Sequence, residues 1–337
     1  MLEHGGRLRE AAACWGIPLA DWLDLSTGIA PWAYPVPSLP TEVWQRLPEE
    51  GDGLEAAAQD YYGAHHLVVL PGSQAAIQRL PTLVPPGRVA VFMPTYAEHP
   101  AAWHAFGHKL VPWDQPADYA VLCNPNNPTG HCFSRDELLD KARKVRLLVV
   151  DEAFMDATPE ASLIGEGQPD NVVVLRSLGK FFGLAGARVG FAVADSTLLT
   201  RLADALGPWP VAHPARWVAR HALVDKDWQA TQRWRLAAAS KRLALLLRNA
   251  GLTWNNPCPP DEWFHYSRVA IGHVSLGTPT GTAFFQTVIT PNAAEIHEQL
   301  ARQGILVRCF EESLRFGLPE DEAAWQRLTQ ATTQCPA

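Results

Sequence analysis

The chain has 337 residues, with 28 basic and 35 acidic side chains and a formal net charge of −7 at pH 7. This mildly acidic composition lacks the basic stripe of nucleic-acid-binding proteins, so we expect a small-molecule partner and no nucleic acid. No stretch approaches the ~18 uninterrupted apolar residues of a membrane-spanning helix, and the N-terminus has no apolar signal segment. We therefore expect a cytoplasmic protein with no membrane partner.

The cysteines are scattered, and no pair has the C-x-x-C spacing of a structural zinc site. We expect free thiols and no bound metal. The six positions are Cys14, Cys123, Cys132, Cys258, Cys309 and Cys335.

The first 40 residues predict a short helix over 7–15 and then an extended proline-rich arm, which must pack on another part of the protein. From residue 54 to 175, short apolar runs rich in β-branched residues alternate with helical patterns. Such runs are typical of buried, largely parallel strands in an α/β layer fold. The strands expected here are residues 67–70, 89–92, 119–122, 147–150 and 172–175.

After residue 190 the pattern predicts an antiparallel edge strand over 191–194 and a long helical stretch over 214–250. Residues 254–281 match neither pattern, and we interpret them as a surface insertion. The remaining elements expected are strands at 284–289, 305–308 and 313–316, a helix at 293–303 and a final helix.

At this length we expect one large and one smaller domain. The N-terminal arm, residues 1–40, is expected to pack with the small domain. The large domain is expected over 41–225 and the small C-terminal domain over 226–337.

Lys180 lies among glycines, a serine and an arginine, just after the expected strand 172–175. Arg188 follows eight residues later. A lysine at a strand end, beside hydroxyl and guanidinium groups that hold a phosphate, suits a Schiff-base enzyme with a phosphorylated aldehyde cofactor. The pattern therefore indicates pyridoxal phosphate. Taken without the other motifs, however, it is better explained as a surface lysine in a glycine-rich loop.

A second phosphate-type element follows the first expected strand. The backbone N–H groups of Gly72, Ser73 and Gln74 are expected to point outward at the positive end of a helix. Alone, this segment is better explained as an ordinary turn with Ser73 as N-cap. Ser177 and Arg188 add side-chain donors for the same anion.

Asn127 and Asp151 each follow an expected strand. The Asn127 amide suits a hydrogen bond to the phenolic oxygen of a pyridine ring, although its proline-flanked segment also fits a plain stiff turn. Asp151 either caps a helix or pairs with a buried cation, and beside a pyridoxal ring it keeps the ring nitrogen protonated. It precedes Lys180 by 29 residues, about one βαβ step, so we expect both at neighbouring strand ends.

In order and spacing, these motifs resemble the fold-type I pyridoxal-phosphate aminotransferase superfamily over residues 54–316. The resemblance implies an α/β fold with a mostly parallel central sheet flanked by helices, plus a smaller α+β C-terminal domain. It assigns Lys180 the Schiff base and proton shuttle, Asp151 the pyridinium contact and Asn127 the ring oxygen. The cofactor phosphate would be held by Gly72, Ser73, Gln74, Ser177 and Arg188.

Further details resemble the threonine-phosphate decarboxylase branch of this superfamily, used in cobalamin biosynthesis and close to histidinol-phosphate aminotransferase. They lie in the segments His4-Gly5-Gly6 with Arg9, Leu25-Ser26-Thr27-Gly28, Pro94–His99, Asp151–Phe154 and Leu314–Pro319. We expect a homodimer, and the resemblance implies that it converts L-threonine O-3-phosphate into (R)-1-amino-2-propanol O-2-phosphate and carbon dioxide. His99, or alternatively Tyr96, would stack on the cofactor, and Phe154 stands where a tyrosine is usual.

The bond that breaks is the one held perpendicular to the cofactor ring, so an anchor for the substrate phosphate would select decarboxylation over transamination. We expect that anchor in His4, the Gly5 and Gly6 amides and Arg9. The rest of the substrate site would comprise Thr27, Gly28, Asn127 and Arg315, the last holding the carboxylate.

Two other functions stay open. One is an aminotransferase acting on histidinol phosphate or a similar amino acid. The other is a non-catalytic scaffold of a corrinoid pathway, which Lys180 argues against because a scaffold needs no such lysine.

Overall fold

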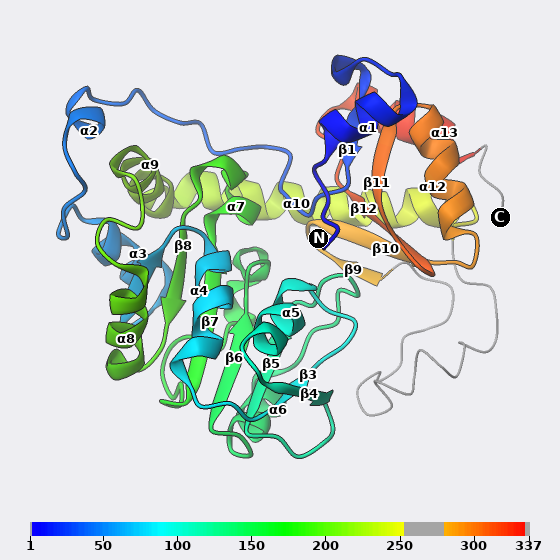
Figure 1. The fold of residues 1–337 in the computed structure, drawn as a ribbon. Helices are drawn as coiled ribbons and strands as arrows, with labels where there is room; N and C mark the ends of the chain where they lie inside the picture. The colour runs from blue at the N-terminus through cyan, green and yellow to red at the C-terminus, as the bar shows by residue number, and fades with distance from the viewer. Residues whose placement is uncertain (1, 253–279, 334–337) are drawn as a thin grey trace.

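A computed structural model of the chain describes residues 2–252 and 280–333, and Figure 1 shows two β-sheets joined by the long helix α10 (Lys226–Asn249). Of residues 254–281, only Thr280 and Gly281 are among those described, so the expected surface insertion lies outside them. None of the helices in the described ranges is long and apolar enough to cross a membrane.

The larger sheet has seven strands in the order β2-β8-β7-β6-β5-β3-β4. The five runs expected between residues 54 and 175 are all strands of this sheet. The bounds are β2 (Leu67–Leu70), β3 (Arg88–Val91), β4 (Lys109–Pro112), β5 (Tyr119–Cys123), β6 (Leu147–Asp151), β7 (Val172–Ser177) and β8 (Gly190–Val193).

The expected edge strand at 191–194 is antiparallel but internal. β8 pairs with β7 on one side and with β2 on the other, so β2 forms the edge and is itself antiparallel to β8. The prediction was wrong because strand order depends on contacts between distant segments, which local sequence does not encode.

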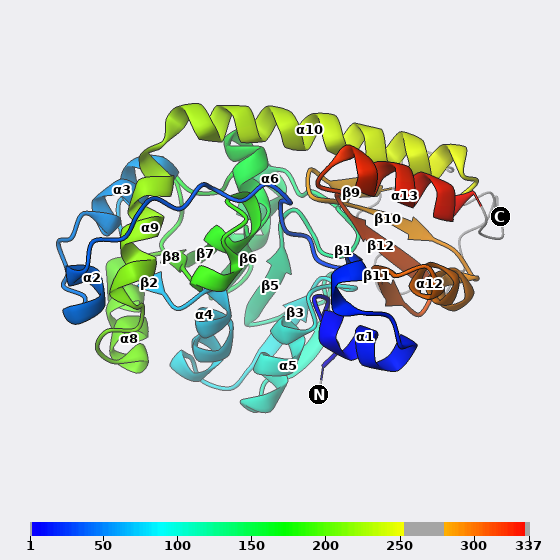
Figure 2. The same ribbon diagram turned by 90° about the horizontal axis from the view of Figure 1, so that it is seen from above.

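The central strands are apolar on both faces because each face is covered by helices. In β6, Leu148 and Val150 contribute to one hydrophobic cluster, whereas Leu147 and Val149 contribute to the other. Helices α4 (Ser73–Arg79), α5 (Glu98–Ala105) and α8 (Ser196–Leu206) cover one face, as Figure 2 shows from above. The other face is covered by α3 (Leu54–Tyr62), α6 (Arg135–Ala142), α9 (His213–Val224) and part of α10.

The helical stretch expected over 214–250 is two helices rather than one. α9 ends at Val224, and Asp225 then caps α10 by accepting a hydrogen bond from the Trp228 N–H at 3.0 Å. An aspartate side chain satisfies the open N–H groups of a new helix, so it favours a start at this point.

The smaller sheet has the strand order β1-β11-β12-β10-β9. Its first strand comes from the N-terminal arm, where Leu23 of β1 pairs in parallel with Ile305 of β11. The strands are β1 (Leu23–Leu25), β9 (Thr280–Thr282), β10 (Phe285–Ile289), β11 (Ile305–Phe310) and β12 (Ser313–Gly317). Helices α1 (Leu8–Trp15), α12 (Ala293–Arg302) and α13 (Glu322–Thr332) lie against this sheet (Figure 1). Because α10 begins at Lys226, we propose the boundaries 1–40, 41–225 and 226–337 for the arm and the two domains.

Candidate functional site

Three polar residues end neighbouring strands of the larger sheet. Cys123 ends β5, Asp151 ends β6 and Ser177 ends β7, and the parallel register pairs Cys123 with Asp151. The carboxyl ends of parallel strands meet at one edge, where open α/β sheets bind ligands. Lys180 follows directly in the short helix α7 (Leu178–Phe181).

Lys180 has the electrostatics of a reactive amine. Burial, together with the positive charge of Arg315, lowers the pKa of Lys180 to about 8, although Asp151 opposes this shift. Its Nζ lies 5.6 Å from the centroid of the Phe154 ring. A lysine with a pKa near neutrality is partly uncharged, and the uncharged form is the nucleophile.

The expected phosphate ligands converge around Gly72. Arg188 has φ +53°, which is uncommon outside glycine, and this conformation brings its guanidinium so close to Gly72 that a Cβ there would collide with it. A Cβ on Gly190 would lie 2.6 Å from the Ser73 nitrogen. Glycine at both positions therefore lets Arg188 and the backbone at Ser73 pack closely together.

Ser73 and Ser177 differ in how their hydroxyls are used. Gly72, not Ser73, is the N-cap of α4, and the Ser73 side chain makes no capping hydrogen bond. The alternative interpretation of Ser73 as an N-cap is therefore wrong. Ser177 caps α7 and accepts from the Gly179 N–H at 3.3 Å.

Asp151 is held on both carboxylate oxygens. Oδ1 accepts from the Ala153 N–H at 3.1 Å, and Oδ2 lies 3.0 Å from His99 Nε2. Burial lowers the pKa of His99, but Cys123 and Asp151 more than offset it and raise this pKa to about 10. A protonated His99 therefore gives Asp151 a fixed cationic partner.

His99 is only 1% exposed and lies against Asp151, so it has no ring face open to a ligand. This burial does not fit the stacking role expected for His99. Tyr96 is half-buried, and its hydroxyl donates to Gln74 Oε1 at 3.2 Å, beside the phosphate ligands. We therefore propose Tyr96, the alternative from the sequence, as the stacking residue.

Arg315 connects the two sheets at the site. Its Nη1 donates to Asn127 Oδ1 at 2.5 Å, and its Nη2 donates to the Ser26 carbonyl at 2.8 Å. Because Asn127 accepts through its oxygen, its amide nitrogen is left to donate to a ligand. Burial, with a contribution from Arg308, lowers the pKa of Arg315 to about 10, where the side chain is still charged at neutral pH.

The N-terminal segment packs against the loop after β1. The Gly6 N–H donates to Ser26 Oγ at 2.7 Å, and Gly5 lies so close to the Ser26 carbonyl that no side chain fits there. A Cβ on Gly28 would lie 2.9 Å from the Phe154 ring. Thr27 is half-buried beside these residues.

His4 and Arg9 have different surroundings. His4 donates from Nε2 to Glu98 Oε1 at 2.7 Å, which fixes it at the start of α5. Arg9 is exposed on α1 and makes no hydrogen bond or ion pair through its side chain within the described ranges. Among residues 2–252 and 280–333, no hydrogen bond or ion pair connects Arg9 to the other expected substrate ligands.

The structure adds Arg308, which the sequence did not indicate. Arg308 on β11 is the cross-strand partner of Arg315 on β12. Its guanidinium donates to the Glu3 carbonyl at 2.9 Å and to the Glu3 carboxylate at 3.3 Å. Only two residues separate β11 from β12, and Arg308 and Arg315 lie equally far from this tight turn. This symmetric spacing is the signal in the sequence that could have revealed the pair.

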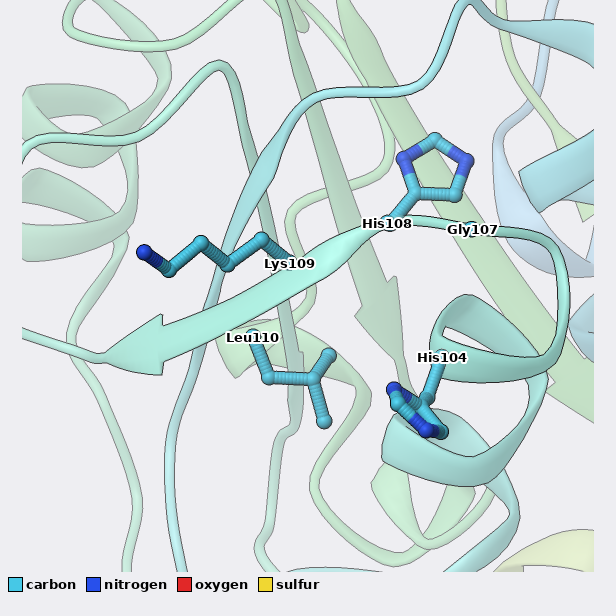
Figure 3. A pocket seen from close by; sticks show the side chains of 5 residues that line it. All are labelled: His104, Gly107, His108, Lys109 and Leu110. Atoms are coloured by element: carbon cyan, nitrogen blue, oxygen red, sulfur yellow. The ribbon is translucent and has the colours of Figure 1, made fainter.

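A shallow pocket lies elsewhere, at the amino end of the edge strand β4. It is lined by His104, Gly107, His108, Lys109 and Leu110 (Figure 3). Both ring nitrogens of His108 are engaged, with the Gly87 N–H at 3.3 Å and the Pro81 carbonyl at 2.9 Å. The candidate site lies instead at the carboxyl ends of the strands, so this pocket is not part of it.

The donor set fits pyridoxal phosphate. Lys180 supplies an amine of lowered pKa, Asp151 supplies a carboxylate with a buried histidine behind it, and Arg188 closes on the glycine-lined backbone at Gly72. This fold and this site define a fold-type I pyridoxal-phosphate enzyme.

The chain belongs to the aminotransferase class I and II family, whose sequence model matches residues 51–333. A threonine-phosphate decarboxylase from Pseudomonas aeruginosa is 51% identical over 345 residues, covering 98% of this chain and 97% of the relative. A threonine-phosphate decarboxylase from Sinorhizobium sp. is 39% identical, again covering 98% and 97%. The solved histidinol-phosphate aminotransferase from Sinorhizobium meliloti in complex with pyridoxal-5'-phosphate has a TM-score of 0.78 at 18% identity, covering 99% of this chain and 95% of that one.

Proposed function

We propose that this protein is a pyridoxal-phosphate-dependent decarboxylase of L-threonine O-3-phosphate, acting in cobalamin biosynthesis. The products are (R)-1-amino-2-propanol O-2-phosphate and carbon dioxide. The choice of substrate is supported by two curated relatives named threonine-phosphate decarboxylase, each of which aligns with 98% of this chain. The structural observation that carries the proposal is the side-by-side pair Arg308 and Arg315, because the substrate has two anionic groups on a short chain.

The cofactor, when bound, supplies an electron sink for the pair released as a bond to the α-carbon breaks. Asp151, backed by His99, would face the ring nitrogen, and the Asn127 amide would donate to the ring oxygen. The phosphate ligands would be the backbone at Gly72 with Ser73, Gln74, Ser177 and Arg188.

Arg315 would hold the substrate carboxylate, and Arg308 would hold its phosphate. Two fixed anchors restrict rotation of the substrate, so they determine which bond of the α-carbon is oriented for cleavage. Thr27, Gly28 and the Gly5 amide would line the same end of the site, and the Gly6 N–H, which donates to Ser26 Oγ, would hold this segment next to Ser26.

Lys180 would donate the proton that the α-carbon needs after carbon dioxide is lost. Loss of carbon dioxide leaves a carbon that needs a proton to give the amine product. With its pKa near 8, Lys180 can hold a proton and release it within the neutral range.

The alternative is an aminotransferase acting on histidinol phosphate or a similar amino acid. The discriminating experiment mixes the protein and pyridoxal phosphate with O-phospho-L-threonine and follows carbon dioxide, then repeats with an amino donor and 2-oxoglutarate. Turnover in the second assay alone contradicts the decarboxylase.

We also propose a homodimer. Four apolar side chains around α2 (Glu42–Gln45) and the segment before α9 are more than half exposed: Val36, Trp44, Leu47 and Trp209. These segments are neighbours, because α2 contacts α9. Exposed aromatic residues of this kind are typical of subunit interfaces.

Analytical ultracentrifugation tests the dimer. Trp44→Glu should give a monomer, whereas Arg143→Glu, at an exposed charged position after α6, should leave the dimer intact. A monomeric wild-type protein contradicts the proposal. The cytoplasmic location expected from the sequence stays a prediction. The cysteines within the described ranges are free thiols, namely Cys14, Cys123, Cys132 and Cys309.

A further inference from the structure

Glu98 at the start of α5 connects three side chains from different parts of the chain. Its Oε1 accepts from His4 at 2.7 Å, and its Oε2 accepts from the side-chain amides of Gln74 at 2.9 Å and Gln78 at 3.1 Å. The Glu98 side chain is only 16% exposed, so these partners replace most of its water. A carboxylate held on both oxygens has a fixed orientation.

The residues around Glu98 belong to both ends of the candidate site. Gln74, one of the expected phosphate ligands, also accepts from the Tyr96 hydroxyl. The ring centroids of Tyr96 and His4 lie 5.7 Å apart. Glu98 therefore joins the cofactor end of the site to the N-terminal segment.

The N-terminal segment is held at its other side by the smaller sheet. Glu3 binds Arg308 on β11, and Gly6 binds Ser26. The consecutive residues Glu3 and His4 thus bridge the smaller sheet and helix α5 of the larger one, directly beside the paired arginines.

We propose that Glu98 is a positioning residue that fixes the N-terminal segment over the substrate site through His4, and so sets the affinity for the phosphorylated substrate. The proposal rests on the proposed function only for the identity of that substrate. With Nε2 donating to Glu98, Nδ1 is the remaining ring nitrogen of His4, and it donates to a substrate oxygen when the ring carries both protons. Loss of the carboxylate leaves His4 and two amide groups without their common acceptor.

Glu98→Met tests this, because methionine keeps the approximate size of the side chain but removes the acceptor of His4, Gln74 and Gln78. At saturating pyridoxal phosphate, the KM for O-phospho-L-threonine should rise about tenfold, with kcat changed less than about twofold. Glu322→Met is the matched control, since Glu322 forms an exposed ion pair with Arg242 on the far side of the small domain. A fall in kcat with unchanged KM overturns the proposal.

A double-mutant cycle separates positioning from general destabilisation. His4→Ala and Glu98→Met should each raise KM, and the double variant should raise it no more than the stronger single variant, because both break the contact between His4 and Glu98. Independent multiplication of the two effects overturns the proposal.

Hydrogen–deuterium exchange gives a readout that does not depend on the substrate. Amides of residues 2–10 should exchange faster in Glu98→Met than in wild type and in Glu322→Met. Unchanged exchange in this segment overturns the proposal even if threonine phosphate is the substrate. If wild type fails to turn over threonine phosphate but the segment still loosens, the proposed function fails and the positioning role of Glu98 stands.

Discussion

Arg308 and Arg315 lie directly opposite each other in the antiparallel pairing of β11 and β12. Two like charges side by side repel, so Arg308 adds to burial, the larger cause, in lowering the pKa of Arg315. The pair is held by acceptors from the N-terminal arm: Glu3 for Arg308 and the Ser26 carbonyl for Arg315. A substrate with two anionic groups would relieve this repulsion, so the arrangement favours binding of phosphorylated amino acids.

Arg308→Ala should raise the KM for O-phospho-L-threonine about 50-fold or more, because a phosphate loses its charged partner. Steady-state kinetics at saturating cofactor measure this. Arg302→Ala, which removes an exposed ion pair with Glu298 on α12, is the control and should leave KM unchanged. A strong rise for Arg9→Ala with none for Arg308→Ala would support the anchor expected from the sequence and contradict the structural assignment.

Loading of the apoprotein with pyridoxal phosphate should accelerate as pH rises from 6 and level off above about pH 8. The reason is that only the uncharged Lys180 amine reacts, and its pKa is lowered to about 8. The absorbance band near about 420 nm follows the loading. Lys180→Ala should show no such band and no turnover. A loading rate that still rises steeply above pH 9 would show that the pKa of Lys180 is that of an ordinary lysine.

Tyr96→Ala should weaken pyridoxal phosphate binding about tenfold, whereas Tyr96→Phe should keep most of the affinity, because stacking needs the ring and not the hydroxyl. Cofactor titration followed by absorbance measures both. His99→Asn should change kcat more than cofactor affinity, since His99 contacts Asp151 and presents no open ring face. The reverse pattern would restore His99 as the stacking residue.

A stability prediction concerns Arg176, which is buried between two carboxylates beneath the site. Its guanidinium lies 3.0 Å from Glu152 and 3.4 Å from Asp156, and all three side chains are at most 2% exposed. Arg176→Ala leaves two buried carboxylates without their cationic partner and should lower the free energy of unfolding by about 3–5 kcal/mol. Urea denaturation measures this change.

The control for that experiment is Arg143→Ala, which removes an exposed pair with Asp140 and should cost less than about 1 kcal/mol. Equal losses in the two variants would show that the buried network contributes nothing beyond a surface pair.

The sequence predicted those features that depend on local pattern. The runs at 119–122 and 147–150 are apolar on both faces, and this pattern occurs only where helices cover both sides of a sheet. The 29-residue interval from Asp151 to Lys180 predicted neighbouring strand ends, which the register of β6 and β7 confirms.

The features that were missed depend on contacts between distant segments. Arg308 becomes relevant only through the register of a hairpin, and β8 is internal only because β2 pairs with its outer side. The burial of His99 behind Asp151 and the meeting of Glu98 with His4 join residues 52 and 94 positions apart, for which no local pattern exists.

The most direct test of the central claim is carbon dioxide release from O-phospho-L-threonine labelled with carbon-13 at its carboxylate, followed by NMR with no 2-oxo acid present. We expect wild type loaded with pyridoxal phosphate to release labelled carbon dioxide and to form one equivalent of aminopropanol phosphate, while Lys180→Ala releases none. No labelled carbon dioxide from wild type, together with a 2-oxo acid that keeps the label when 2-oxoglutarate is added as amino acceptor, would contradict that claim.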